Sequence, residues 1–241
     1  MTKRRIDTLL VERGLVESQA RAQAMIMAGD VLVAGQPITK AGSLVAEEAV
    51  ITINEPPPFV GRGGFKLEYA LDKFQVDVSS KVAADIGAST GGFTDCLLQR
   101  GASRVYAVDV GYGQLDYRLR QDSRVVVMER VNARYPINLP EKVDLATIDV
   151  SFISVEKVIP SVVQLVKESG SLLVLIKPQF EARRGEVGKG GVVKQPNIHA
   201  KVLGRFIVWL IKHNFRLGGL AASPILGASG NKEFFVLLEL T

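Results

Sequence analysis

The sequence is poor in cysteine and histidine, with one cysteine, Cys96, and two histidines, His199 and His213, among 241 residues. A single cysteine cannot form an internal disulfide, and one cysteine with two histidines cannot make a usual zinc cage. We therefore expect no metal site. Cys96 lies in an apolar helical stretch and is expected to be a buried thiol, whereas both histidines are expected on helix surfaces.

The sequence also lacks a run of about 18 apolar residues, the length that a membrane-spanning helix needs. Residues 1–7 lack the apolar centre of a secretory signal, so a cytoplasmic protein is expected. With 47% hydrophobic and 23% charged residues, the chain is long enough for one large and one small globular domain. The net charge of +5 favours an anionic partner.

Three consecutive prolines, Pro56 to Pro58, predict a stiff, extended boundary between a domain at 1–55, a linker at 56–64 and a domain at 65–241. In the larger domain, apolar strand signals alternate with helical patterns, which is typical of an α/β fold with a mostly parallel sheet and helices on both faces. Seven strands are expected, the last two as an antiparallel edge, at 82–86, 105–108, 125–128, 143–148, 172–177, 217–222 and 234–240. Helices are expected at 92–99, 155–167 and 196–213.

The most informative segment is 85–93, where an apolar strand enters glycines and then a helical pattern. Such a turn lets a ligand lie against bare backbone at a helix N-terminus. Three residues separate Gly87 from Gly91, so the spacing departs from the dinucleotide fingerprint. Asp109 ends the next expected strand, where a ribose diol would lie, and the pattern favours a nucleoside cofactor such as S-adenosylmethionine. An ordinary strand–turn–helix corner capped by Ser89 or Thr90 is the alternative. The expected cofactor contacts are Asp85, Gly87, Ala88, Ser89, Gly91, Gly92, Phe93, Asp109 and Asp149.

Lys66, Asp149, Lys177 and Glu233 occur where an open α/β sheet places its active site, at the ends of strands and in the adjoining loops. Lys177 ends a run of five apolar residues. Desolvation beside a second cation, here Lys66, favours a neutral lysine that can act as general base on a weakly acidic alcohol such as a ribose 2′-hydroxyl. Asp149 and Glu233 would then orient the two lysines, and Glu239 is the other candidate for the glutamate. Two structural salt bridges are the alternative interpretation.

The first fifty-five residues predict two short helices, at Ile6 and after a capping Ser18, and a small β-hairpin that follows a Gly29 stop. Residues 5–7, 18–21 and 29–35 resemble the S-four-type RNA-binding domain of a ribosomal protein, although Ala34 stands where that domain usually has asparagine. A dimerisation or lid module is the alternative. Arg4, Arg5, Arg13 and Arg21 are the expected RNA contacts of this α+β module.

Nearly the whole chain resembles the TlyA-type haemolysin family of FtsJ-like ribose 2′-O-methyltransferases. The resemblance is carried by 62–67, 85–92, 149–153, 177–181 and 230–235. It implies a Rossmann-like methyltransferase with a Lys-Asp-Lys-Glu tetrad, S-adenosylmethionine as cofactor and a cytidine of ribosomal RNA as target. It also implies that Asn132 contacts the adenine of the cofactor.

A basic, glycine-rich loop at 183–194 follows the expected base and suits the clamping of phosphates, although a solvated surface loop is equally plausible. Phe152 and Phe180 would stack an extruded nucleotide, with ordinary packing as the alternative. The expected RNA contacts of the larger domain are Arg62, Arg183, Arg184 and Lys189.

The leading hypothesis is an S-adenosylmethionine-dependent methyltransferase that acts on a ribose 2′-hydroxyl of ribosomal RNA, free or in a ribosomal subunit. A membrane-lytic protein, as the family's historical name suggests, is a second hypothesis. A non-catalytic RNA-binding factor is a third. The sequence indicates neither the modified nucleotide nor the oligomeric state.

Overall fold

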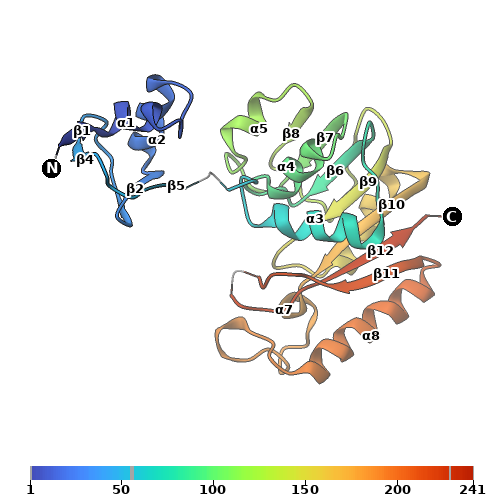
Figure 1. Cartoon of the computed structure of the whole chain (residues 1–241). Helices are drawn as coiled ribbons and strands as arrows, with labels where there is room; N and C mark the ends of the chain where they lie inside the picture. Colours follow the sequence, from blue (N-terminus) through green and yellow to red (C-terminus); the bar gives the residue numbers. More distant parts are fainter. Residues whose placement is uncertain (1, 55–56, 228, 241) are drawn as a thin grey trace. The chain divides into compact units, whose positions relative to one another are not determined.

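The computed structural model describes residues 2–54, 57–227 and 229–240. The chain divides into two compact units, Met1–Pro58 and Phe59–Thr241 (Figure 1). Residue 55, the last of the expected first domain, and residue 56, the first of the expected linker, lie outside the described residues. Phe59 is buried in the core of the second unit, and the Val60 backbone N–H donates to Asp95 Oδ2 at 2.8 Å. The second unit therefore begins at Phe59, inside the segment 56–64.

The first unit contains two helices and two small antiparallel sheets. As the sequence predicts, the Ser18 side chain caps the second helix by accepting from the Arg21 backbone N–H, and Gly29 ends it in the left-handed conformation. Ile6, Leu10 and Ile26 are fully buried between the helices and the sheets. The elements are β1 (Lys3–Arg5), α1 (Ile6–Glu12), α2 (Gln19–Ala28), β2 (Val31–Val33), β3 (Gln36–Pro37), β4 (Leu44–Ala46) and β5 (Ile51–Ile53).

The second unit is built on a seven-stranded sheet with the order β11-β12-β10-β9-β6-β7-β8. Its strands are β6 (Val82–Ile86), β7 (Arg104–Val108), β8 (Val125–Met128), β9 (Val143–Ile148), β10 (Val166–Ile176), β11 (Arg216–Ala222) and β12 (Phe234–Glu239). The pairs from β10 through β9, β6 and β7 to β8 are parallel, and β12 is antiparallel to both β10 and β11. The predicted mostly parallel sheet with an antiparallel last pair is confirmed.

Helices cover both faces of this sheet, as the alternating pattern predicts (Figure 1). Leu67, Leu97 and Leu119 pack on one face, and Ile159 and Phe206 pack on the other. Each face is thus closed by apolar helix residues, while the ends of the strands stay open to carry polar groups. The first group of helices is α3 (Gly63–Phe74), α4 (Gly92–Gln99) and α5 (Tyr117–Gln121), the second is α6 (Ile159–Val162) and α8 (Pro196–Lys212), and α7 (Pro178–Glu181) follows β10.

Two details of the sequence prediction are wrong. The single helix expected at 155–167 is a 3₁₀ turn (Val155–Lys157), the one-turn α6 and a second 3₁₀ turn (Val163–Leu165), after which β10 already begins at Val166. This segment is rich in β-branched residues, which lower helix propensity and suit the parallel pairing of Val166 with Val143. His199, expected on a helix surface, is buried on α8.

Candidate active site

The glycine loop after β6 is held close to the end of β9. Gly87 has a φ of 88°, and the backbone N–H groups of Gly87 and Ala88 both donate to the Val108 carbonyl, at 2.8 and 3.1 Å. A Cβ atom on Gly87 would lie 2.5 Å from the Asp149 carbonyl oxygen. Both the positive φ and this close approach require glycine. The loop therefore meets the segment that carries Asp149.

A cavity of about 480 Å³ opens beside this loop, between the ends of β6, β7, β8 and β9. Asp109 lies on its wall, and its carboxylate accepts from the backbone N–H groups of Ser89 at 2.8 Å and Gly111 at 2.6 Å. These bonds fix the carboxylate at the place that the sequence predicts for a ribose diol. Asn132 lines the same cavity together with apolar side chains, namely Val108, Val110, Val131, Val150 and Ile153. The size, the apolar walls and the fixed carboxylate fit a nucleoside.

Two of the expected cofactor contacts, Asp85 and Gly91, line neither this cavity nor the adjoining one described below. The Asp85 carboxyl is fully buried and accepts from Thr94 Oγ1 at 2.7 Å and Thr147 Oγ1 at 3.1 Å. Burial, the largest influence, raises the pKa of Asp85 to about 7. Gly91 is the N-cap residue of α4 and has the left-handed conformation, and a Cβ atom there would collide with Leu119. Asp85 and Gly91 therefore support the loop without lining either cavity.

A second cavity, of about 340 Å³, shares Gly87, Ser89 and Asp149 with the first. Lys66 from α3, Asp149 after β9, Lys177 after β10 and Glu233 before β12 all line it. The structure therefore brings together the four residues that the sequence singles out from separate segments. The remaining lining residues are Arg62, Gly63, Gly87, Ala88, Ser89, Thr90, Gly92 and Phe93.

The four residues form two ion pairs. Lys66 Nζ lies 2.6 Å from Glu233 Oε2, and the two side chains are only 9% and 3% exposed. Lys177 Nζ lies 2.6 Å from Asp149 Oδ1, and the Asp149 side chain is 20% exposed. Lys177 Nζ also donates to Ser151 Oγ at 3.0 Å. Sequence reasoning missed Ser151, although its position two residues after Asp149 in the same motif was the available signal.

Glu239, the other candidate for the glutamate, does not reach this cavity. Its carboxylate pairs with Arg216 Nε at 3.1 Å, and it lines a separate cavity with Phe74 and Leu240. Glu233, and not Glu239, therefore lines the cavity that contains Lys66 and Lys177.

Two aromatic side chains stand beside the cavities. Phe152 is 91% exposed, has a φ of 63° and lines the 480 Å³ cavity. Its ring lies 5.0 Å, centroid to centroid, from the ring of Phe180 on α7. A large apolar side chain held in a left-handed conformation and open to solvent is costly, which is typical of a functional position.

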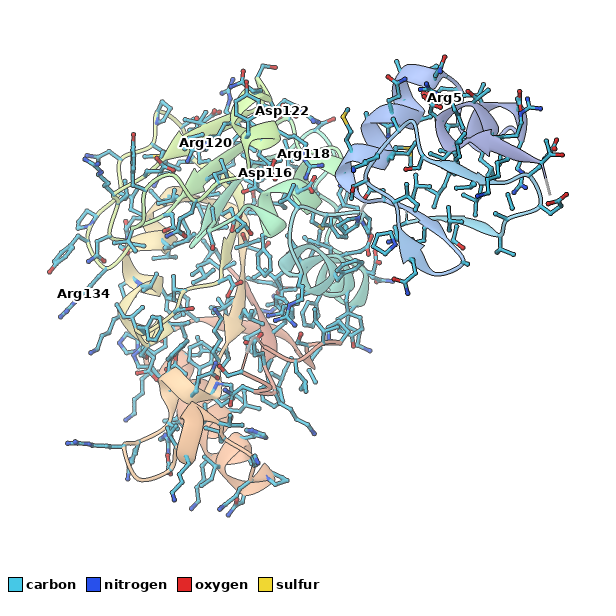
Figure 2. The ribbon with its side chains drawn as sticks, turned by 90° about the vertical axis from the view of Figure 1, so that its left-hand side faces the viewer. Arg5, Asp116, Arg118, Arg120, Asp122 and Arg134 are labelled. Carbon is cyan, nitrogen blue, oxygen red and sulfur yellow. The ribbon has the colours of Figure 1, made fainter. Side chains whose placement is uncertain are left out.

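The cations of the second unit differ in what they contact. Arg62 lines the 340 Å³ cavity, and Arg183, Arg184 and Lys189 are exposed on the loop after α7. Arg134, which the sequence did not single out, lies at the rim of the 480 Å³ cavity and points outward from the ribbon (Figure 2). On α5, Arg118 and Arg120 are engaged by carboxylates, with Asp116 and Glu129 as partners (Figure 2).

Of the arginines expected to bind RNA in the first unit, Arg4, Arg5 and Arg13 make internal contacts. Arg4 pairs with Glu12, and Arg13 donates to the backbone carbonyls of Glu47 and Ala49. Arg5 binds Asp7 in a two-pronged pair, Nη2 to Oδ2 at 2.7 Å and Nε to Oδ1 at 3.0 Å. Its side chain remains 54% exposed (Figure 2), and that pair, the largest influence, lowers the pKa of the buried Asp7. Arg21 is exposed on α2.

Comparison with known proteins agrees with this geometry. The FtsJ-like methyltransferase family matches residues 59–240, and the S4 domain matches residues 4–51. The chain belongs to the FtsJ-like methyltransferase family. Its large unit is thus a methyltransferase domain of the α/β class, and its small unit is an S4 domain.

Individual relatives cover nearly the whole chain. YqxC of Bacillus subtilis is 48% identical over 98% of this chain and 86% of its own length. A Mycobacterium tuberculosis protein named 16S/23S rRNA (cytidine-2'-O)-methyltransferase TlyA is 42% identical over 98% of this chain and 89% of its own length. A solved Streptococcus thermophilus structure named as a hemolysin is 42% identical, with a TM-score of 0.75, and the match covers 100% of this chain and 90% of that chain.

Residues 2–54, 57–227 and 229–240 contain neither a membrane-spanning helix nor a metal-binding cluster. No helix there is long and apolar enough to cross a membrane. No group of three or more histidine, cysteine, aspartate or glutamate side chains there is arranged to hold a metal ion.

Proposed function

We propose that this chain transfers a methyl group from S-adenosylmethionine to a ribose 2′-hydroxyl of ribosomal RNA. The observation that carries the proposal is the shared wall of the two cavities. Asp149 faces the nucleoside-sized cavity on one side and contacts Lys177 in the other. A cofactor in the first cavity and an alcohol in the second would meet at this wall.

The residues of the first cavity suit the cofactor. Asp109 would accept from the ribose diol, and Asn132 would contact the adenine among the apolar side chains of that cavity. Of the expected contacts, Gly87, Ala88, Ser89, Gly92 and Phe93 line one or both cavities and offer backbone for close approach. Bound S-adenosylmethionine would supply an electrophilic methyl group.

Lys177 would act as the general base. In its neutral form, the Nζ atom would take the proton of the 2′-hydroxyl as the new O–CH₃ bond forms and the methyl–sulfur bond of the cofactor breaks, with S-adenosylhomocysteine as the leaving group. The Asp149 carboxylate at 2.6 Å would stabilise the ammonium so produced. Ser151 Oγ accepts a second N–H of the same lysine and fixes its direction. Lys66, paired with Glu233 in the same cavity, would donate to the acceptor oxygen.

The substrate assignment rests on the S4 domain and on the relative from Mycobacterium tuberculosis, which is named for cytidine 2′-O-methylation. We extend this activity to the present chain and propose that its target is a cytidine of ribosomal RNA in the cytoplasm. The small unit would supply affinity for the RNA, and the large unit would carry out the methyl transfer. An extruded nucleotide would stack on Phe152 and Phe180. The proposed phosphate contacts are Arg4, Arg5, Arg13, Arg21, Arg62, Arg183, Arg184 and Lys189.

The test is methyl transfer from isotopically labelled cofactor to ribosomal subunits isolated from cells that lack this protein. Labelled ribose in the nucleoside digest is the expected product, and Lys177→Ala is expected to lower the rate by about 10³-fold or more. Lys167→Ala is the matched control, since Lys167 forms an exposed pair with Asp144 at 2.7 Å. Equal incorporation by wild type and Lys177→Ala would rule out the mechanism.

The same preparation separates the other hypotheses. Leakage of dye from phospholipid vesicles, unchanged in Lys177→Ala, would favour the lytic protein. Tight binding to subunits without any labelled ribose would favour the non-catalytic RNA-binding factor.

A further inference from the structure

The basic loop at 183–194 is tied down by a residue far away in the sequence. Asn231 is only 1% exposed. Its Nδ2 donates to the Gly191 carbonyl at 3.0 Å, and its Oδ1 accepts from the Val193 backbone N–H at 2.8 Å. Both polar ends of one buried amide are therefore used to hold the backbone of the loop.

A second buried side chain, that of His199, contacts the same part of the loop. His199 Nε2 lies 2.8 Å from the Val193 carbonyl, which can only accept, so this nitrogen donates. The His199 ring packs against Phe234 with 5.6 Å between ring centroids. Val193 is thus held at its N–H by Asn231 and at its carbonyl by His199, while its side chain is buried in the core.

The anchor of the loop lies close in sequence to an active-site residue. Asn231 lies two residues before Glu233, and its own carbonyl accepts from the Gly227 backbone N–H at 2.9 Å. Phe234 pairs across the sheet with Ile176, the residue before Lys177. Figure 1 shows the segment between α7 and α8 leaving the sheet beside the β11–β12 connection. The loop is therefore fixed to the turn that bears Glu233.

The backbone of the loop needs such an anchor. Gly190 and Gly191 both have a φ of 74°, and a Cβ atom on either would meet open space, so little packing restrains them. The exposed cations of the loop are Arg183, Arg184, Lys189 and Lys194. Without the anchor, their backbone would have to be ordered when a polyanion binds, at a cost in affinity.

We propose that Asn231 and His199 are positioning residues that pre-order the basic loop beside the 340 Å³ cavity, so that its cations meet the phosphates of the RNA substrate. Neither side chain is among the residues that line the two cavities. The identity of the polyanion rests on the proposed function, whereas the anchoring itself does not.

The test compares full-length wild type with Asn231→Ala in three measurements. Trypsin cleavage after Arg183, Arg184, Lys189 and Lys194, followed by mass spectrometry, is expected to become about tenfold faster. The KM for ribosomal subunits is expected to rise about fivefold to tenfold, with kcat within about twofold of wild type. The reason is that the free-energy cost of ordering the loop weakens substrate binding and leaves the chemical step unchanged. Affinity for S-adenosylmethionine, from calorimetry, is expected to stay within about twofold of wild type.

Asn197→Ala is the matched control, since Asn197 is exposed in the first turn of α8, and none of the three quantities should change. If Asn231→Ala does not fold, His199→Phe, which removes the donor to the Val193 carbonyl and keeps a ring, tests the second anchor with the same changes expected, and His199→Gln, which keeps a donor, should show little change. Unchanged trypsin cleavage in a folded variant, or a loss of kcat and cofactor affinity with an unchanged KM, would overturn the proposal. Filter binding of ribosomal RNA needs no turnover, so the loop can be tested even if methyl transfer fails.

Discussion

The two lysine–carboxylate pairs of the 340 Å³ cavity have the same length and different surroundings. Lys66 and Glu233 are 2.6 Å apart and almost sealed, and Gly227 packs so closely on the glutamate that a Cβ atom there would collide with Oε1. Lys177 and Asp149 are also 2.6 Å apart, yet Asp149 borders both cavities and Lys177 has a second partner in Ser151.

This difference predicts different roles for the two ion pairs. A sealed pair is shielded from solvent and holds α3 against the turn before β12. In the open pair, the carboxylate borders both cavities and so lies where the two proposed reactants would meet. Damage to the sealed pair should therefore lower stability as well as rate, whereas damage to the open pair should act mainly on rate.

The largest expected effect comes from breaking the sealed pair. Glu233→Gln leaves the Lys66 ammonium buried without its counter-charge, which should lower the free energy of unfolding by about 3 kcal/mol. Urea denaturation monitored by circular dichroism measures it. The double variant Lys66→Met with Glu233→Leu should recover most of that loss without recovering activity. A single variant as stable as wild type would mean that the pair does not contribute to folding.

The next effect comes from the open pair. Ser151→Ala removes an acceptor of Lys177 while leaving the ion pair to Asp149. We expect kcat to fall about tenfold with little change in KM or stability, since one hydrogen bond that directs the proposed base is lost. Ser151→Thr, which keeps the hydroxyl, should restore most of the rate. Steady-state kinetics on ribosomal subunits distinguishes this from a substrate contact, for which KM would rise.

A further effect is a pH dependence, smaller per pH unit than the loss above, and concerns a buried carboxyl with no lysine partner. The pKa of Asp85, about 7 in the folded chain, exceeds the ordinary value near 3.9, so the folded state keeps a proton that the unfolded state has lost. Stability should therefore fall as pH rises from 4 to 7, by up to about 1.4 kcal/mol per pH unit.

Asp85→Asn should flatten this slope, and urea denaturation at several pH values checks it. Asp72→Asn is the control, because Asp72 is an exposed partner of Arg100. An identical slope in wild type and Asp85→Asn would show that Asp85 is ionised throughout.

Much of this arrangement could be predicted because strand ends are visible in the sequence. A run of apolar residues that stops at Asp149 or Lys177 marks the edge of the sheet, and parallel strands bring such edges together. Which lysine pairs with which carboxylate could not be predicted, because that depends on how α3 packs against β12. The burial of Asp85 behind its loop depends likewise on Thr94 and Thr147 from other elements.

The errors have a similar cause. A histidine suggests a surface position by its residue type, yet His199 lies three residues before Val202 and seven before Phe206, on the buried face of α8, where the Val193 carbonyl of the loop contacts its ring. The run 155–167 has helical spacing as well as β-branched composition, and pairing with β9 decided the outcome at its end.

The buried Cys96 has a practical consequence. It is the single cysteine of the chain, it is fully buried in α4, and burial, the largest influence, raises the pKa of its thiol to about 12. Such a thiol is almost entirely protonated at neutral pH and reacts slowly with maleimides. A cysteine introduced at Lys189 would therefore take a fluorophore selectively in the otherwise native sequence, giving a direct optical readout of the basic loop as RNA arrives.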